Sequence, residues 1–243
     1  MRLPYFPLHV VVFPHLPLPL HIFEPRYRAM TRDVLADGSP YAGRFVVSMI
    51  TEGAEVGEEP GRRASGQRVG TIVQVRRSER LPNGRWVLLT VGVERALLGE
   101  VDRSGEYATV EVTPLADDGG DRRAADALLP EVQAALDHYL ETVKRFVTSA
   151  ASFGSKSQEI TDVAASLDEV LKPIRLPDDP LAASYAVGGV LQIELTRKQH
   201  LLELPDAASR LQAELELLRR EARLLADGAM PPVSTGDLHY NPN

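Results

Sequence analysis

The chain has 243 residues, of which 44% are hydrophobic and 25% charged, a composition that excludes wholesale disorder and a collagen-like structure. Its 27 Lys and Arg residues against 34 Asp and Glu residues give a formal net charge of −7, which argues against a nucleic-acid binder with a basic surface throughout. The absence of cysteine excludes disulfides, thiolate metal sites and a cysteine nucleophile, and it fits a reducing cytoplasm, where we place the protein.

Residues 1–115 are rich in Val, Thr and Pro, and their pattern is typical of short strands. We predict a strand at Arg2–Leu8, where the prolines favour an edge or bulged position, and a second extended piece at Leu16–Phe23. Glu24 and Pro25 then open a helix that ends at Asp37-Gly38, because proline suits the first helical position and glycine the position after the last.

The β pattern continues to residue 114. The predicted elements are a short apolar strand at Phe45–Ile50, an alternating strand at Val69–Arg77, a hairpin turn at Pro82-Asn83-Gly84, a long strand at Arg85–Glu100 and a last strand at Tyr107–Pro114. Short strands, one helix and Pro-rich crossings predict a compact β-barrel.

Residues 116–228 carry a helical period instead, after a polar linker at 117–121. Apolar residues at i, i+3 and i+4 spacing predict amphipathic helices, the first over 128–147 and the second over 160–171. Asp179-Pro180 opens a third helix through about Glu194, Thr196 and Gln199 form a capping box for a short fourth, and Asp206 caps a fifth. We interpret 231–243 as a flexible tail.

The fifth helix has apolar residues at alternating spacings of four and three: Leu211, Leu215, Leu218, Ala222 and Leu225. This stripe is compatible with packing inside its own domain or with a dimeric coiled coil. Three turns are short for a coiled coil, so packing within the domain is the favoured interpretation.

Motifs for catalysis are missing from the sequence. Gly154-Ser155-Lys156-Ser157 lacks the glycines of a phosphate loop, and a Ser–Lys dyad in this polar break lacks a desolvated lysine. The six histidines show no metal-ligand spacing, so we predict no metal, no cofactor and no enzymatic activity. No apolar run reaches about 18 residues and prolines interrupt the N-terminus, so neither a membrane span nor a signal peptide is predicted.

A basic cluster surrounds the predicted hairpin turn and consists of Arg76, Arg77, Arg80 and Arg85. Arginines on such a hairpin are able to meet phosphate, but Glu79 dilutes them and Trp86 is the only aromatic residue nearby. We interpret the cluster as solvated, with contact to protein or nucleic acid as the alternatives.

Several blocks resemble the Lon N-terminal, or Lon substrate-binding, domain. They are the segments 3–8, 11–14 and 18–28, the blocks at Val69–Ile72, Leu81–Arg85 and Gly92–Arg95, and the helical segments at 179–182, 198–203 and 206–211. Their order and spacing agree with that family over about residues 2–228.

The resemblance implies an α+β fold, a PUA-like β-barrel over 1–115 followed by a helical bundle over 116–230. It also implies a non-catalytic module that binds client or unfolded polypeptide segments, because in full Lon proteases this region helps to select substrates. The chain ends before an ATPase or protease domain would begin, so degradation is not carried over. The alternatives are an RNA-binding PUA-like protein and a structural subunit of a larger assembly.

For the client-binding surface we predict apolar surface at the Pro-rich crossings together with the cleft between barrel and helical bundle, with the residues Phe13, Pro14, Leu16, Phe23, Tyr27 and Trp86. Proline limits ladder hydrogen bonding there, so some side chains are left outside the barrel core, and exposed apolar patches mark interaction sites. The alternative is that Phe13 and Phe23 fill the barrel. We expect Glu24, Arg26 and Arg95 to be mainly structural, through pairing with each other or with the backbone, and the alternative is contact with a ligand.

Overall fold

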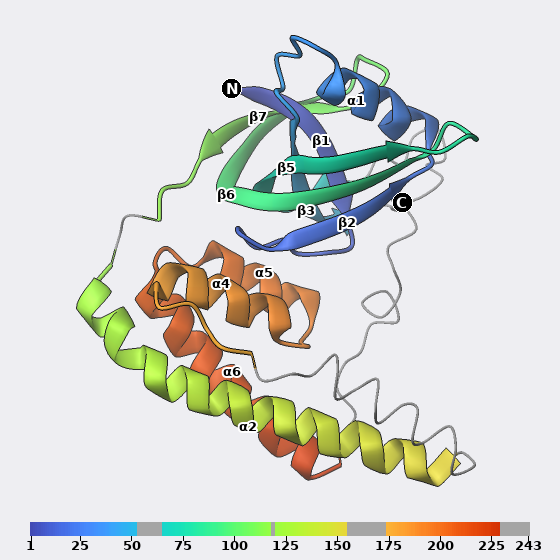
Figure 1. The fold of residues 1–243 in the computed structure, drawn as a ribbon. Helices are drawn as coiled ribbons and strands as arrows, with labels where there is room; N and C mark the ends of the chain where they lie inside the picture. The colour runs from blue at the N-terminus through green and yellow to red at the C-terminus, as the bar shows by residue number, and fades with distance from the viewer. Residues whose placement is uncertain (53–64, 118–119, 155–173, 229–243) are drawn as a thin grey trace. The chain divides into compact units, whose positions relative to one another are not determined.

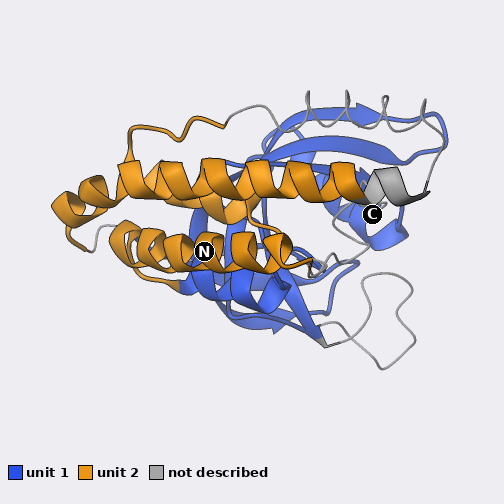
Figure 2. Ribbon diagram, turned by 90° about the horizontal axis from the view of Figure 1, so that it is seen from below, with its two compact units in different colours: residues 1–117, 193–203, 233–243 blue, residues 118–192, 204–232 orange. Residues whose placement is uncertain are grey.

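The computed structural model describes residues 1–52, 65–117, 120–154 and 174–228 (Figure 1). Within these residues the chain forms two compact units, coloured separately in Figure 2. The barrel unit contains residues 1–117 and 193–203, and the helical unit contains 120–192 and 204–228 where they are described. The second helix predicted at 160–171 and the predicted tail at 231–243 lie outside the described residues.

The barrel unit is built on a seven-stranded sheet. Its elements are β1 (Arg2–Leu8), β2 (Pro17–Ile22), α1 (Pro25–Leu35), β3 (Arg44–Glu52), β4 (Ser65–Gly66), β5 (Val69–Arg80), β6 (Trp86–Asp102), β7 (Thr109–Pro114) and α5 (Leu195–Glu203). The strand order β1-β7-β6-β5-β3 becomes a closed ring because β1 also pairs with β3. That pairing is parallel and sets Tyr5 opposite Val46, whereas the other pairings in the ring are antiparallel.

Strand β1, most of β3 and the first part of β5 are buried on both faces, which explains why these strands lack a clean alternation of apolar and polar residues. In β1, Tyr5 belongs to a core cluster drawn from the ring strands, whereas its neighbour Phe6 belongs to a second cluster that includes β2 and α1. The Phe6 ring lies 4.1 Å from the ring of Tyr27 on α1. Helix α1 therefore covers one face of the barrel sheet, and buried side chains of β2 belong to the same core cluster.

The predicted hairpin between β5 and β6 is confirmed by their antiparallel pairing. Its turn follows from local chemistry, since the amide of Arg85 donates to the Asn83 side chain at 3.1 Å and Gly84 has a φ of +76°. The alternation predicted for the strand starting at Val69 is interrupted by a bulge between Ile72 and Val73, and both of these side chains are buried.

The helical unit consists of α2 (Arg122–Gly154), α4 (Pro180–Val190) and α6 (Ala207–Ala226). Helices α2 and α6 pack against each other, and the apolar stripe predicted for α6 is buried. The structure thus places that stripe within the chain's own helical unit. Helix α4 ends at Val190 rather than near Glu194, because two glycines directly before Val190 lower the helical propensity of its last turn.

Two helix starts test the predicted caps. The carboxylate of Asp206 accepts the amide of Ser209 at 2.9 Å, so the predicted N-cap of α6 is confirmed. The capping box at Thr196 is wrong, because α5 already begins at Leu195. The Gln199 side-chain amide instead donates to the Val69 carbonyl at 3.0 Å, a tertiary contact within the barrel unit.

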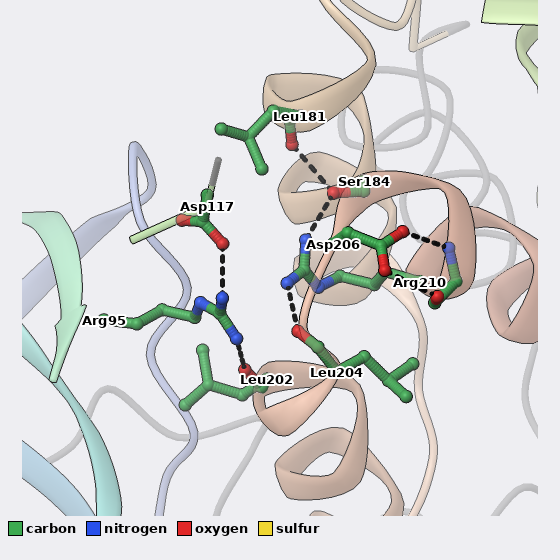
Figure 3. A network of polar contacts seen from close by, with 9 residues as sticks. Arg95, Asp117, Leu181, Ser184, Leu202, Leu204, Asp206 and Arg210 are labelled. Carbon is green, nitrogen blue, oxygen red and sulfur yellow. Dashed lines mark hydrogen bonds and ion pairs between the residues drawn. The ribbon is translucent and has the colours of Figure 1, made fainter. Parts of the chain in front are cut away.

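The helical unit buries a cation and a carboxylate one helical turn apart. Arg210 and Glu214 of α6 are both 0% exposed. The Arg210 guanidinium donates to Ser184 and to the Leu204 carbonyl, each at 2.9 Å (Figure 3). It also lies 4.4 Å from the centre of the Tyr185 ring. Burial raises the pKa of the Glu214 carboxyl well above its usual range, an effect that Arg210 only partly offsets.

The raised pKa predicts how Glu214→Gln changes the pH dependence of stability. Between the ordinary pKa of 4.5 and the raised folded-state pKa, the folded protein keeps this proton while the unfolded chain releases it. The free energy of unfolding then falls as the pH rises, by up to about 1.4 kcal/mol per pH unit. The variant lacks this contribution, so its stability relative to the unsubstituted protein should increase with pH across the window and level off above it.

Urea unfolding of both proteins at a series of pH values measures this difference. Glu216→Gln, an exposed position on the same helix, is the matched control and should show no such trend. A stability difference for Glu214→Gln that does not change with pH would contradict the prediction.

Candidate functional site

The six residues predicted for a binding surface divide into two groups by burial. Phe13 is 1% exposed, Tyr27 is 4% exposed and Pro14 is buried. Leu16, Phe23 and Trp86 are half-buried and retain accessible surface. The sequence-based alternative of core filling therefore describes Phe13, whereas Phe23 keeps part of its surface accessible.

The segment after β1 is held on the barrel by backbone contacts that its prolines do not prevent. Thr71 donates its hydroxyl to the Val12 carbonyl at 2.5 Å, and the His15 amide donates to the Gly92 carbonyl at 2.8 Å. A Cβ added to Gly92 would lie 2.4 Å from the Phe13 carbonyl oxygen. Because only glycine permits this approach, the crossing packs directly on β6, which accounts for the burial of Phe13.

Strands β2 and β6 together present an apolar surface. They pair in the register Pro17 with Val91, Pro19 with Leu89 and His21 with Val87, without a bulge. Alternation along both strands places these side chains on one face, and Leu89 is 42% exposed. We call the residues Pro17, Pro19, Val87, Leu89 and Val91 the β2–β6 face.

Two of the predicted residues flank this face. Leu16 directly precedes β2 and Phe23 directly follows it, and the Phe23 ring lies 6.1 Å from the ring of His21. Leu89 was missed by sequence reasoning, although the odd-numbered apolar residues of β6 carried the signal. Their exposure became visible only when the partner strand was known.

The free edge of β2 restricts how a polypeptide is able to bind here. Among the described strands, β2 pairs only with β6. Proline is tolerated in a strand where its nitrogen points away from the neighbouring strand, so Pro17 and Pro19 leave that edge without donors at two positions. Addition of another strand is disfavoured, and the face is suited to side-chain contacts.

Trp86 lies on the other side of β6, because it is three residues from Leu89. It lines a cavity of about 450 Å³ between α1 and the β5–β6 hairpin. The predicted basic residue Arg80 lines the same cavity, together with arginines from α1 that the sequence had not grouped with it. The sequence carried little indication of this grouping, because the α1 arginines are far from the hairpin along the chain.

The polar residues expected to be structural make the contacts that such a role requires. Arg95 is 2% exposed, forms an ion pair with Asp117 at 2.5 Å and donates to the Leu202 carbonyl of α5 at 2.8 Å (Figure 3). Arg26 forms an ion pair with Glu24 at 3.0 Å. The expected pairing of side chains with each other and with the backbone is therefore present.

Some chemistry is absent from the part of the chain that the structure describes. Over these residues no three His, Asp or Glu side chains gather closely enough to hold a metal ion. None of the described helices combines the length and apolarity needed to cross a membrane. Ser155 and Lys156, considered above as a dyad, lie outside the described residues.

Known proteins resemble this chain along most of its length. Lon proteases from Geobacter metallireducens, Solibacter usitatus and Escherichia coli K12 are 26%, 29% and 22% identical to it over 229, 228 and 227 residues. These alignments cover 92%, 92% and 93% of this chain but 24%, 25% and 25% of the relatives. The chain thus spans about a quarter of the length of the curated relatives that it matches.

Solved structures share the fold. The N-terminal domain of Mycobacterium avium complex Lon protease matches with a TM-score of 0.58 at 18% identity, covering 90% of this chain and 98% of that domain. A Lon N-terminal domain protein from Xanthomonas campestris matches with a TM-score of 0.55 at 20% identity, covering 89% and 98%. These likenesses confirm the predicted α+β architecture of a barrel followed by helices.

A family model supplies the remaining link between fold and family. It describes the substrate-binding domain of the ATP-dependent protease La (LON), not the ATPase or protease domain, and it matches residues 2–220. Because the match extends from β1 into α6, both units are included in it. The chain therefore belongs to the family of LON substrate-binding domains.

Proposed function

We propose that this chain is a non-catalytic module that binds unfolded segments of client polypeptides through the β2–β6 face. The observation that carries the proposal is the exposure of Leu89, at 42%, in the middle of an apolar strand pair. Unfolded chains differ from folded ones chiefly in their accessible apolar side chains, and an exposed apolar face binds such side chains by burying them.

The family supports this proposal, because its model describes a substrate-binding domain. The residues bearing the function are Leu16 and Phe23 at the ends of β2 and Leu89 on β6. Phe13, Pro14 and Tyr27 are buried and are not part of the proposed contact surface. Recognition proceeds through apolar side chains rather than strand addition, because prolines occupy the β2 edge.

The first test is a single charge placed on the face. Leu89→Asp should weaken binding of a fluorescently labelled, permanently unfolded polypeptide without acidic residues by at least about tenfold, because a carboxylate would lose hydration against the apolar client. Fluorescence anisotropy measures the affinity. Leu224→Asp is the matched control, since Leu224 is 38% exposed on α6 of the helical unit, and it should bind as the unsubstituted protein does.

Hydrogen exchange with and without the same polypeptide locates the contact. We expect added protection in residues 16–23 and 86–91. Protection confined to the C-terminal helices, or equal weakening by Leu89→Asp and Leu224→Asp, would overturn the proposed surface. Salt-dependent binding of RNA without client binding would favour the RNA-binding alternative, and co-purification with one partner at fixed stoichiometry would favour a structural subunit.

A further inference from the structure

A basic cavity in the barrel unit is not used by the apolar surface proposed above. It has a volume of about 450 Å³ and is lined by Pro25, Arg26, Arg28, Ala29, Arg32, Arg80, Gly84, Trp86 and Glu106. Four of these residues are positively charged and one is negatively charged. The lining comes from α1, from the β5–β6 hairpin and from the connection between β6 and β7, all in one compact unit.

The four arginines differ in how far their charges are already satisfied. Arg26 forms an ion pair with Glu24 at 3.0 Å and lies 4.5 Å from the centre of the Tyr27 ring. Arg32 approaches Glu106 only to 3.9 Å, and these two side chains are 61% and 78% exposed. This second pair is loose and screened by solvent, so it contributes little to stability.

The other two guanidiniums, those of Arg28 and Arg80, form no ion pair with any carboxylate of the described residues. Arg28 lies against the turn, since a Cβ added to Gly84 would be 2.4 Å from its Nη2 atom. Arg80 lies 5.9 Å from the centre of the Trp86 ring. Two charges that lack a carboxylate partner within the described part of the chain therefore line the cavity, one against Gly84 and one beside an aromatic ring.

We propose that this cavity binds a short acidic segment of a polypeptide, with Asp or Glu carboxylates on Arg28 and Arg80 and an adjacent apolar side chain on Trp86. Guanidinium groups bind carboxylates through paired, charge-assisted hydrogen bonds. Arginine and tryptophan are enriched among the residues that dominate the energy of protein interfaces.

The charge of the whole chain favours a peptide over a nucleic acid. The net charge is −7, so the long-range field repels an extended polyanion. A segment with two or three carboxylates interacts with the local arginines over distances that salt does not fully screen. The cavity volume also suits one or a few side chains rather than an extended strand.

This inference deepens the proposed function and rests on it, because the acidic segment would belong to a client polypeptide. The two surfaces are nevertheless separate, since Leu89 and Trp86 face opposite sides of β6. A client with an apolar stretch and a nearby acidic stretch would engage both, which selects among unfolded polypeptides by their charge pattern.

The test uses the full chain and two short labelled peptides of equal length. One peptide carries Asp-Glu-Asp beside a phenylalanine, and the other carries Asn-Gln-Asn in its place. We expect the acidic peptide to bind at least about tenfold more tightly and to weaken as salt is added. Because Trp86 is the only tryptophan, the acidic peptide should also change the tryptophan fluorescence of the protein.

Variants assign the effect to the cavity. The double substitution Arg28→Gln with Arg80→Gln should weaken the acidic peptide at least about tenfold and leave the neutral unfolded polypeptide unaffected. Arg123→Gln with Arg175→Gln removes the same charge from exposed positions of the helical unit and is the matched control. Circular dichroism establishes that each variant is folded.

The outcomes separate this inference from the proposed function. Equal binding of the two peptides, or equal effects of the two double variants on the acidic peptide, overturns the inference. The proposed function still stands in that case if Leu89→Asp weakens binding of the unfolded polypeptide. The inference is also overturned if tripolyphosphate or RNA binds more tightly than the acidic peptide and this binding is lost in the Arg28 and Arg80 double variant. That result would assign the cavity to phosphate. If neither Leu89→Asp nor any other variant weakens binding of the unfolded polypeptide, only the proposed function is overturned.

Discussion

Arg95→Ala should lower the free energy of unfolding by about 3–5 kcal/mol, the usual cost of removing one partner from a buried ion pair. Arg95 is 2% exposed, and its side chain joins β6 to Asp117 and to the carbonyl of Leu202 on α5. Alanine leaves a largely buried carboxylate without its cation and a carbonyl without this donor. The attachment of α5 within the barrel unit should weaken first.

Urea unfolding and hydrogen exchange measure this effect, with exchange in 195–203 rising before exchange in β6. Arg197→Ala is the matched control, because Arg197 is 39% exposed and pairs with Glu194 at 3.5 Å; its stability should stay within about 0.5 kcal/mol. Unchanged stability of Arg95→Ala together with lost client binding would contradict the structural role and make Arg95 a binding residue.

Arg210→Ala should cost a similar amount, about 3–5 kcal/mol, for a combination of reasons. The side chain is large and 0% exposed, so its removal leaves a cavity. Ser184 and the Leu204 carbonyl lose a charged donor, and the Tyr185 ring loses its cation. Buried Glu214 loses the neighbouring positive charge that lowers its pKa.

A double variant distinguishes loss of the interactions between the buried polar groups from loss of packing alone. Replacing a buried pair by apolar residues of similar volume is often neutral, so Arg210→Met with Glu214→Leu should recover most of the stability lost in Arg210→Ala. Thermal unfolding monitored by circular dichroism measures both variants. If the double variant is less stable than Arg210→Ala, the energetic coupling of Arg210 and Glu214 is contradicted.

The candidate surface was only partly accessible to sequence reasoning, for a reason visible at Phe13 and Leu89. The prolines around Phe13 correctly indicated a segment unable to form a regular central strand. They did not indicate that Thr71 and Gly92 would bind its backbone, residues almost 60 and 80 positions away. Burial of Phe13 and exposure of Leu89 both depend on which strand covers which face.

The basic cavity illustrates the same limit. Arg80 and Trp86 were recognised around the hairpin turn, but their significance changed once α1 brought Arg28 against Gly84. Local sequence placed a turn at Gly84 and a helix at Pro25. The local sequence did not indicate that this turn and this helix lie close together, because their distance depends on how α1 packs on the barrel sheet.

The sequence by itself determined the elements whose signals are local: β1 at Arg2–Leu8, the β5–β6 hairpin, the start of α1 at Pro25 and the cap of α6 at Asp206. These depend on backbone angles and hydrogen bonds over a few residues. Its ordered blocks also determined the family. Only the tertiary structure decided the parallel closure of β1 on β3, the contact of α5 with β5 in the barrel unit, and the side chains left at the surface. Closure, burial and exposure depend on contacts between residues far apart in the chain, and a local pattern that fits several such arrangements cannot choose among them.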